Sequence, residues 1–413
     1  GGNLDTYFTG EAKTKEIFME ETPEDAFAVV EGVMGLYDGL GGILEEGSTY
    51  HLAKAISLPV ILVIDAHGMG RTILPLIQGL LSYDKAGIIK GVILNRVSKM
   101  FYASLKELIE TELSIEVLGC FSEQKELHLE SRHLGLKLPE EKRDLKEQVC
   151  RGADSLKETV SIERILAIGG AGEKDAASPK VDSHENKVTY QRADIKENDT
   201  HESKLRLAIA RDEAFCFYYE DNLNLLSEIG AEIVKFSPLE NESVPQCDGL
   251  ILGGGYPELY ADILEKNTGT LNSVEECVES GVPCIAECGG FMYLHEIMED
   301  SDKNEHGMVG IIKGKCRKTD RLQRFGYMEM TANRDNILCK KGDKIRAREF
   351  HYFDSDCNGN GFTAVKNDRQ WECVNVDKNL FAGFPHLHFF ANINFAENFM
   401  KSCEEYKCTK SKN

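Results

Sequence analysis

The sequence lacks several features that would place it in common classes of protein. Its longest apolar run, residues 58–64, is far shorter than the ~20 residues that a membrane helix needs. Its thirteen cysteines are scattered and include no CxxC pair, which argues against a zinc ribbon and a disulfide framework. No charged and then apolar leader of the signal-peptide type is found. These absences predict a protein of the reducing cytoplasm without a membrane partner.

Basic residues are also scarce. Lys and Arg number 48 against 69 Asp and Glu, which gives a formal net charge of −21. Nucleic-acid binding depends on concentrated Lys and Arg, so this composition argues against a nucleic-acid partner. An acidic surface of this kind favours solubility, and an anionic substrate would need a locally basic pocket.

The length of the chain and its periodic pattern predict two α/β domains. At 413 residues the chain is too long for one ordinary core. In the first half, short apolar runs rich in β-branched residues alternate with helical patterns, as in a doubly wound parallel sheet. The predicted buried strands are residues 27–33, 60–65 and 91–95, and the helices between them are residues 71–81 and 100–113.

A polar segment separates the two halves. Residues 169–203 are charged and nearly free of large apolar side chains, so we expect a flexible linker between a first domain (residues 1–168) and a second (residues 204–413). In the second domain the α/β pattern returns. Strands are predicted at residues 205–210, 232–236, 249–252 and 282–287, and a helix at residues 219–229.

The sharpest local signal lies around Cys288. An apolar strand runs into this cysteine, two glycines follow it, and an amphipathic helix begins. That is the pattern of a nucleophile elbow, in which small neighbours allow the backbone to crowd the nucleophile. The start of a helix favours the thiolate form, and the N–H of Gly289 would point at a developing oxyanion.

Two further segments supply the groups that such a nucleophile requires. Three glycines follow a strand at residues 253–255, and the amides of Gly254 and Gly255 are candidates for a second oxyanion donor. Late in the chain, His386 and His388 alternate along a predicted strand, so both imidazoles can face the same way and either can act as base. Elbow, glycine loop and late histidine in that order indicate a catalytic site more strongly than any one of them alone.

These segments, together with others along the chain, make the sequence resemble a known family. It is similar to the cobyrinic acid a,c-diamide synthases, whose second half is a class I-like glutamine amidotransferase domain. The resemblance is carried by EGVMGLYDG (31–39), ILVIDAHGMGRT (61–72), GVILNRV (91–97), RDEAFCFYYEDNL (211–223), DGLILGGGYPELY (248–260), AECGGFMYL (286–294), FGYMEM (325–330), REFHYFD (348–354) and HLHF (386–389).

In the second domain the resemblance implies roles for particular residues. Cys288 corresponds to the nucleophile of the family's CGG motif, and the strand with two histidines supplies its base. His386 is favoured by position, with His388 as the alternative. The usual His-x-Glu pattern is absent, because His386 is followed by Leu387 and His388.

In the first domain the resemblance implies an ATP-dependent synthetase of the phosphate-loop type. Glu31 is the preferred Mg²⁺ ligand and Asp38 the second candidate, since Mg²⁺ takes one or two carboxylates plus phosphates. Asn95 would contact adenine through its side-chain amide. No GxxxxGK[ST] motif occurs in the sequence. We therefore expect the family's first portion to be missing and ATP to bind poorly.

The activity implied is ATP- and glutamine-dependent amidation of the a and c carboxylates of cobyrinic acid in cobalamin biosynthesis. Another tetrapyrrole, such as nickel sirohydrochlorin or hydrogenobyrinic acid, and a truncated chain with only glutaminase or binding capacity stay open as alternatives. A homodimer is also left open. The basic stretch at residues 314–330 contains Arg321 and Arg324, which suit bidentate carboxylate binding; a solvated basic turn is its other interpretation.

Overall fold

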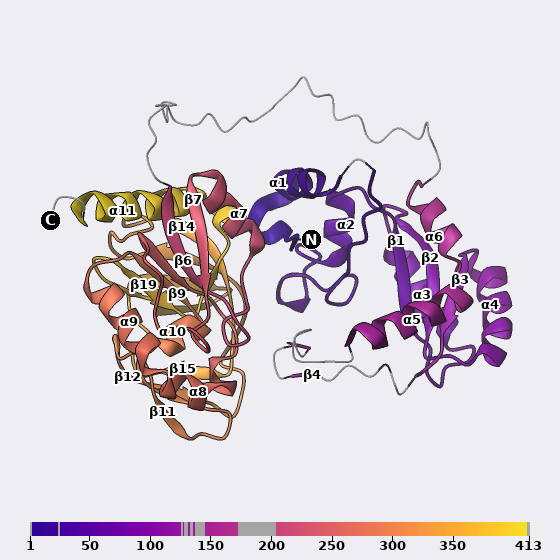
Figure 1. Ribbon diagram of the computed structural model, residues 1–413. Helices are drawn as coiled ribbons and strands as arrows, with labels where there is room; N and C mark the ends of the chain where they lie inside the picture. The colour runs from indigo at the N-terminus through magenta and orange to yellow at the C-terminus, as the bar shows by residue number, and fades with distance from the viewer. Residues whose placement is uncertain are drawn as a thin grey trace. The chain divides into compact units, whose positions relative to one another are not determined.

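The computed structural model describes residues 2–23, 25–124, 127, 131–132, 135–136, 145–171 and 204–410. They form two compact units (Figure 1). Unit 1 comprises Gly1–Thr14, Asp38–Ser48 and Ser203–Asn413, and unit 2 comprises Lys15–Tyr37 and Thr49–Glu202. The predicted linker lies almost entirely outside the described residues, and the predicted domain boundaries stay a prediction. No helix within the described ranges combines the length and apolar character that crossing a bilayer requires.

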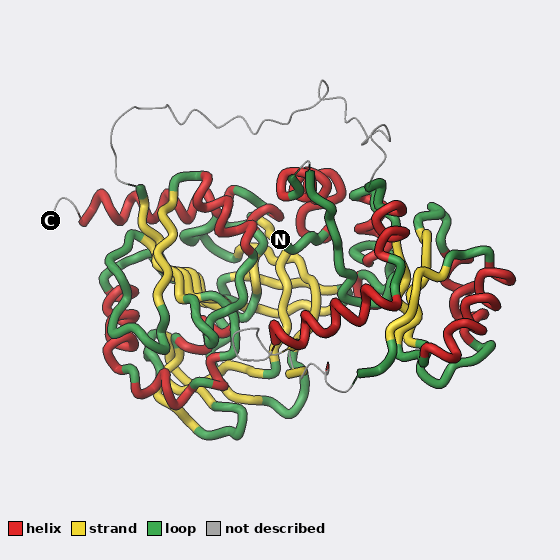
Figure 2. Tube along the Cα trace, turned by 45° about the vertical axis from the view of Figure 1, so that its right-hand side comes forward, coloured by secondary structure: helices red, strands yellow, loops and turns green. Residues whose placement is uncertain are grey.

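Unit 2 is built on a three-stranded parallel sheet in the order β1-β2-β3 (Val60–Asp65, Ile89–Asn95 and Val117–Phe121). The apolar faces of helices α3 (Ile73–Tyr83) and α4 (Lys99–Leu113) complete one hydrophobic core with these strands. Figure 2 shows the strands in yellow with red helices beside them. The structure confirms β1, β2, α3 and α4 as predicted, each end within two residues. The other elements are α2 (Thr49–Ala55), β4 (Ser131–Arg132), β5 (Gly135–Leu136), α5 (Leu145–Thr159) and α6 (Ile162–Ile168).

The strand predicted at residues 27–33 does not form. These residues have no regular secondary structure, and Val29 and Val33 are 85% and 91% exposed. A β-strand needs a neighbour with which to pair its backbone N–H and C=O groups. None of the described strands pairs with this segment, so its β-branched composition alone does not make it part of a sheet.

Unit 1 is built on a six-stranded sheet in the order β18-β19-β9-β8-β6-β7. Neighbouring strands pair in parallel, except that β18 is antiparallel to β19. The strands are β6 (Leu205–Ala210), β7 (Ala231–Phe236), β8 (Gly249–Leu252), β9 (Cys284–Glu287), β18 (Asn375–Val376) and β19 (Leu380–Gly383). The structure confirms the first four of these as predicted, and α7 (Glu220–Glu228) confirms the predicted helix between β6 and β7.

Each face of this sheet carries its own hydrophobic core. On β6, Ala208 and Ala210 belong to a core with residues of α8 (Ala261–Lys266), α9 (Thr268–Glu279) and α10 (Gly289–Tyr293). Leu207 and Ile209 belong to the opposite core, with residues of α7 and α11 (Asn394–Lys410). The period-two alternation of strand side chains therefore supplies both cores, as expected for a sheet covered on both faces.

Two further sheets in unit 1 were not predicted. One is antiparallel, in the order β17-β16-β13-β14-β20, and the other has the order β11-β10-β12-β15. Their strands are β10 (His295–Glu299), β11 (Glu305–Gly307), β12 (Ile312–Lys318), β13 (Arg324–Ala332), β14 (Lys344–His351), β15 (Phe353–Ser355), β16 (Phe362–Lys366), β17 (Arg369–Cys373) and β20 (His386–Leu387). The edge strand β20 pairs with β14, with His386 opposite Arg348. This pairing fixes the backbone of the late histidine segment.

The first residues of the chain pack on unit 1. Asp5 accepts a hydrogen bond from the Tyr327 hydroxyl at 2.5 Å, and burial raises the pKa of its carboxyl group. Phe8 stacks on the ring of His388, with 5.2 Å between the ring centroids. Helix α1 (Thr6–Glu21) begins in this segment and is interrupted at Gly10, where φ is 71° and ψ is 165°. Residues near the start of the sequence therefore belong to the same compact unit as its last strands.

We expect Phe8→Ala to lower the free energy of unfolding of unit 1 by about 3 kcal/mol. Phe8 is only 4% exposed and contacts both Tyr219 and His388. Urea unfolding followed through the single tryptophan, Trp371, measures the change. Phe325→Ala is the matched control, because Phe325 is 48% exposed and its loss should cost less than about 1 kcal/mol. Equal effects of the two substitutions would contradict this packing.

Candidate active site

Cys288 lies at a strained turn. It follows β9 directly and has φ 47° and ψ −101°, on the positive-φ side that residues other than glycine rarely adopt. Its N–H donates to the Gly383 oxygen of β19 at 2.8 Å, and α10 begins at the next residue. A single strained residue between a buried strand and a helix has the geometry of a nucleophile elbow.

Close packing explains the two glycines after Cys288. A Cβ atom on Gly290 would lie 2.0 Å from the carbonyl oxygen of Leu252, at the end of β8. One on Gly289 would lie 3.0 Å from the backbone nitrogen of Gly255. The same closeness brings the Gly255 amide beside the turn at Cys288, where an oxyanion hole needs a donor.

The glycine loop at residues 253–255 is fixed by a half-buried tyrosine. The Tyr218 hydroxyl accepts a hydrogen bond from the Gly253 N–H at 2.9 Å, and burial raises the pKa of Tyr218, so the hydroxyl stays neutral. A Cβ atom on Gly254 would lie 2.5 Å from Cε1 of His386. One on Gly255 would lie 2.1 Å from a backbone oxygen. Only glycine fits these positions, and the loop backbone packs against the imidazole.

His386 is the histidine that interacts with Cys288. Its Nδ1 is 3.6 Å from Oε2 of Glu287, and the side chain is buried. Burial lowers the pKa of His386, but the charge and hydrogen bond of Cys288, together with Glu287, outweigh burial and raise this pKa to about 9. The imidazole is therefore protonated at neutral pH, which suits a thiolate–imidazolium pair.

His388 has a different environment. Strand β20 ends at Leu387, so the alternation that predicted both imidazoles on one face does not extend to His388. Its Nε2 is 3.7 Å from Oδ2 of Asp221, and its ring stacks on Phe8. The side chain of Asn222 holds the backbone on both sides of His388. It donates a hydrogen bond to the Leu387 oxygen and accepts one from the Phe389 N–H, each at 2.8 Å. The geometry therefore favours His386 as the base.

These groups are the parts of an acyl-transfer site. Cys288 offers a nucleophilic sulfur, His386 can hold and return a proton, and the amides of Gly255 and Gly289 lie next to the turn. All of them sit at the carboxyl ends of β8, β9 and β19, the edge at which parallel α/β sheets form their sites.

Comparison with known proteins identifies the family. Residues 206–393 match the CobB/CobQ-like glutamine amidotransferase domain, and residues 9–131 match an AAA domain. The chain is 36% identical over 410 residues to the cobyrinate a,c-diamide synthase of Caldanaerobacter subterraneus subsp. tengcongensis, covering 98% of the chain and 87% of that relative. The synthase of Clostridium acetobutylicum is 35% identical over 409 residues (97% and 87% covered), and that of Picrophilus torridus 35% over 402 (97% and 86%). The chain belongs to the cobyrinate a,c-diamide synthase family.

Membership of this family confirms the resemblance drawn from the sequence. The chain combines an AAA domain with a glutamine amidotransferase domain, as predicted, and it is a member of a family of glutamine-hydrolysing ligases. The elbow at Cys288 and the glycine loop both lie within the matched amidotransferase residues.

In the AAA domain, Asn95 ends β2. Its side-chain oxygen accepts a hydrogen bond from the Arg96 N–H at 3.0 Å. A pocket of about 340 Å³ lies at the same edge of the sheet and is lined by Gly68, Arg96 and Phe101, among others. Ligands of parallel α/β sheets bind at this edge, so the pocket beside Asn95 is a candidate ligand site. Its contact with adenine stays a prediction.

Glu31 and Asp38, the predicted Mg²⁺ ligands, are both exposed. Within the described ranges, no three His, Cys, Asp or Glu side chains are grouped so as to hold a metal ion. Mg²⁺ in a nucleotide site is bound largely by phosphates and water, with one or two carboxylates. Glu31 and Asp38 do not form a complete metal site by themselves, and their role as Mg²⁺ ligands stays a prediction.

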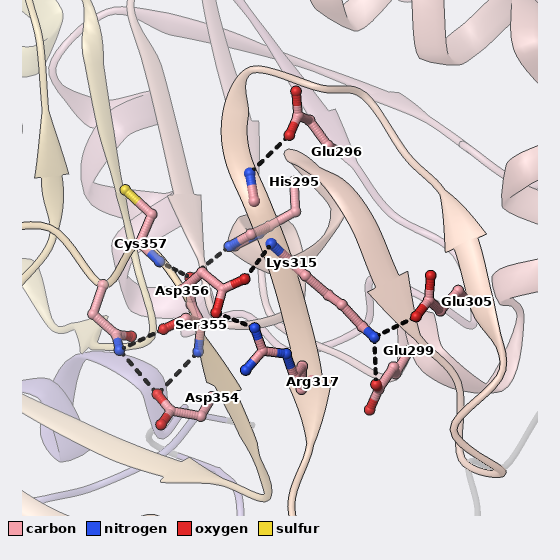
Figure 3. Close-up of polar contacts among 12 residues, drawn as sticks. His295, Glu296, Glu299, Glu305, Lys315, Arg317, Asp354, Ser355, Asp356 and Cys357 are labelled. Atoms are coloured by element: carbon pink, nitrogen blue, oxygen red, sulfur yellow. Dashed lines mark hydrogen bonds and ion pairs between the residues drawn. The ribbon is translucent and has the colours of Figure 1, made fainter.

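Several cations of the basic stretch are paired with acids (Figure 3). Nζ of Lys315, on β12, lies 2.8 Å from Glu299 and 2.5 Å from Glu305. Arg317 pairs with Asp356. These pairs neutralise the charge that the sequence alone offered to an anionic substrate.

Arg321 and Arg324, the two predicted substrate ligands, are less strongly neutralised. Arg321 is exposed and lies between β12 and β13. Arg324 stacks its guanidinium group 4.8 Å from the centre of the Trp371 ring, and its Nη1 lies 3.8 Å from Glu349. Their contact with substrate stays a prediction.

Sequence reasoning missed three residues that shape this site. Tyr218 fixes the glycine loop, Asn222 holds the backbone beside His388, and Glu287 faces His386. Tyr218 and Asn222 lie in the segment FCFYYEDN, where nothing distinguishes them from ordinary core and helix residues. Glu287 had a visible signal, because it is a carboxylate at the end of a buried apolar strand, next to the predicted nucleophile.

Proposed function

We propose that the protein is a cobyrinate a,c-diamide synthase, which uses ATP and ammonia from glutamine to amidate the a and c carboxylates of cobyrinic acid. The observation that carries this proposal is the strained turn at Cys288, with the buried imidazole of His386 against the glycine loop beside it. Named relatives about one-third identical over nearly the whole chain support the substrate.

Ammonia is released at Cys288. The sulfur attacks the side-chain amide carbon of glutamine, and the amides of Gly289 and of Gly254 or Gly255 stabilise the oxyanion that forms. His386 protonates the leaving nitrogen, the C–N bond breaks, and ammonia leaves. Water then hydrolyses the thioester to glutamate and restores the thiol.

Amidation takes place in the synthetase domain. ATP phosphorylates a substrate carboxylate to an acyl phosphate, and ammonia displaces inorganic phosphate to give the amide. Mg²⁺ bound with the nucleotide would neutralise phosphate charge, with Glu31 as its first candidate ligand and Asp38 as its second. Asn95 would contact the adenine. Keeping both reactions in one protein delivers ammonia without dilution.

The organisation proposed along the sequence is a synthetase domain at residues 1–168, a linker at residues 169–203 and an amidotransferase domain at residues 204–413, with residues 1–14 and 38–48 of the first belonging to the compact unit that contains the last. All thirteen cysteines are free, which suits the reducing cytoplasm. A homodimer is compatible with this organisation, and no described feature argues for it.

The proposal is tested by isotope transfer. The full-length protein is incubated with MgATP, cobyrinic acid and glutamine labelled with ¹⁵N at the side-chain amide, and the corrinoid is analysed by mass spectrometry. We expect product with two labelled amides. Nickel sirohydrochlorin and hydrogenobyrinic acid are assayed in parallel, and faster amidation of either would assign the substrate differently. Glutamate release without any amidation would leave only the glutaminase activity.

We expect Arg321→Ala and Arg324→Ala each to raise the KM for cobyrinic acid about tenfold, because a lost charge-assisted hydrogen bond costs roughly 1.5–3 kcal/mol. The glutaminase activity should stay nearly unchanged. Arg317→Ala is the matched control, since Asp356 already neutralises Arg317. Steady-state kinetics with varied corrinoid measure the effect. Equal loss of both activities would indicate misfolding, and unchanged kinetics would make the stretch a solvated turn.

A further inference from the structure

The largely buried carboxylate of Glu287 has, among the residues that the structure describes, no cationic partner other than a histidine. Its side chain is 13% exposed. Among the described residues, His386 is the only cationic side chain within 4.0 Å of it. Glu287 also lines a small cavity of about 30 Å³, and no Lys, Arg or His is among the other residues that line it. A buried carboxylate without compensation is costly, so this charge requires the imidazolium of His386.

The two oxygens of Glu287 have different neighbours. Oε1 accepts a hydrogen bond from the Leu387 N–H at 3.1 Å, which ties the carboxylate to the residue that follows His386. Oε2 faces Nδ1 of His386 at 3.6 Å, and Nδ1 has no hydrogen-bond partner elsewhere in the described chain. With Nδ1 facing the acid, Nε2 is left for the sulfur of Cys288. In the Cys–His–acid arrangement, the acid holds the imidazole in this orientation.

We propose that Glu287 is the positioning residue of the glutaminase site, an acid supplied from the strand before the nucleophile in place of the absent His-x-Glu. This inference rests on the glutaminase function proposed above. Glu287 ends β9 and Cys288 is the turn residue that follows it, so the two adjacent side chains leave the backbone in different directions, and the acid and the sulfur approach His386 through different ring nitrogens. The carboxylate holds the imidazolium and stabilises its charge while ammonia is released.

The groups that set the protonation of His386 can be named. Cys288, at the start of α10, and Glu287, at the end of β9, both favour the charged imidazole. Arg348, opposite His386 on β14, interacts instead with Asp5, and the loop at residues 253–255 contains only glycine. Loss of Glu287 therefore removes one of the two groups that stabilise the imidazolium of His386, and none of the other groups named here can replace it.

Glu287→Gln separates charge from structure, because the glutamine carbonyl can still accept from the Leu387 N–H. We expect kcat for glutamine hydrolysis to fall about 100-fold, with KM changed less than about threefold. The alkaline limb of the kcat/KM profile should move to lower pH, since the imidazolium then loses its proton more easily. Glu287→Asp should recover part of the rate.

Asp221→Asn is the matched control. It removes a carboxylate that is more deeply buried than Glu287 and lies 3.7 Å from His388 rather than beside His386, and it should leave kcat within about threefold of the wild type. Circular dichroism establishes that each variant is folded. A Glu287→Gln protein with wild-type kcat and an unchanged pH profile would overturn the proposal, as would equal losses in Glu287→Gln and Asp221→Asn.

A second measurement does not depend on glutamine. Iodoacetamide alkylation of Cys288, followed on its own peptide by mass spectrometry, should be about tenfold slower in Glu287→Gln at neutral pH. At high pH, where the thiolate forms without the imidazolium, the two rates should agree. If the wild-type protein hydrolyses no glutamine, the proposed function fails while the alkylation rates still decide the role of Glu287. Equal rates at neutral pH would refute that role.

Discussion

In the full-length protein, Cys288→Ala is expected to release no glutamate from glutamine, a loss of at least about 10³-fold, and to keep its activity with ammonium chloride. The sulfur acts only in hydrolysing glutamine, whereas ATP-dependent amidation uses ammonia from any source. Glutamate release and corrinoid amidation are measured separately, the second with glutamine and then with ammonium chloride as nitrogen donor.

Cys284→Ala is the matched control for this substitution. Cys284 is fully buried on the same strand, four residues before the turn, and its loss should leave glutamine hydrolysis in place. Glutamate release at the wild-type rate by Cys288→Ala would show that the turn does not hold the nucleophile. Loss of ammonia-driven activity as well would point to a folding defect.

His386→Ala is expected to lose about 10²–10⁴-fold in glutamine hydrolysis, the usual contribution of a positioned acid–base group. His388→Ala should lose less than about tenfold, because His388 faces Asp221 and Phe8. It should instead lower stability, since its buried ring packs against the first residues of the chain. Glutaminase kinetics and urea unfolding of both variants make the comparison. The reverse order of activity losses would assign the base to His388.

The α/β sheet of each unit could be predicted from the sequence because its strands are short apolar runs. Strand Gly249–Leu252 is buried along its whole length, and its apolar composition reports that burial directly. Strand Val60–Asp65 buries Leu62 and Ile64 on one face, while Val63 on the other face is 64% exposed, so its apolar composition predicts the strand but overstates its burial. Residues 27–33 have a similar composition but no partner strand, and pairing is a tertiary property that a local pattern does not contain.

The antiparallel strands after residue 300 could not be predicted in the same way. They contain many charged residues, as in Arg324–Ala332 and Lys344–His351, and β14 pairs with β20 across 40 positions of the chain (387 − 347). The position of β20 depends on this sheet. The sequence therefore could not show that the strand stops between His386 and His388.

Local motifs predicted which residues cluster in the candidate site, and spacing did not predict their contacts. The turn at Cys288 can be predicted from one continuous segment of the sequence, in which an apolar strand is followed by the cysteine and two glycines. The pairing of Glu287 with His386 joins residues 99 positions apart (386 − 287) through the parallel register of β9 and β19. Only the folded sheet shows that an acid stands where the His-x-Glu pattern is missing.

The central claim is that Cys288 is the nucleophile of a glutamine amidotransferase, and covalent trapping tests it most directly. The protein is treated with a glutamine analogue that carries an electrophilic chloroketone in place of the amide, digested, and mapped by mass spectrometry. The account predicts one adduct, on the peptide containing Cys288, and protection of that peptide by excess glutamine. Labelling spread over the other cysteines, or an adduct at Cys288 that glutamine does not prevent, would contradict it.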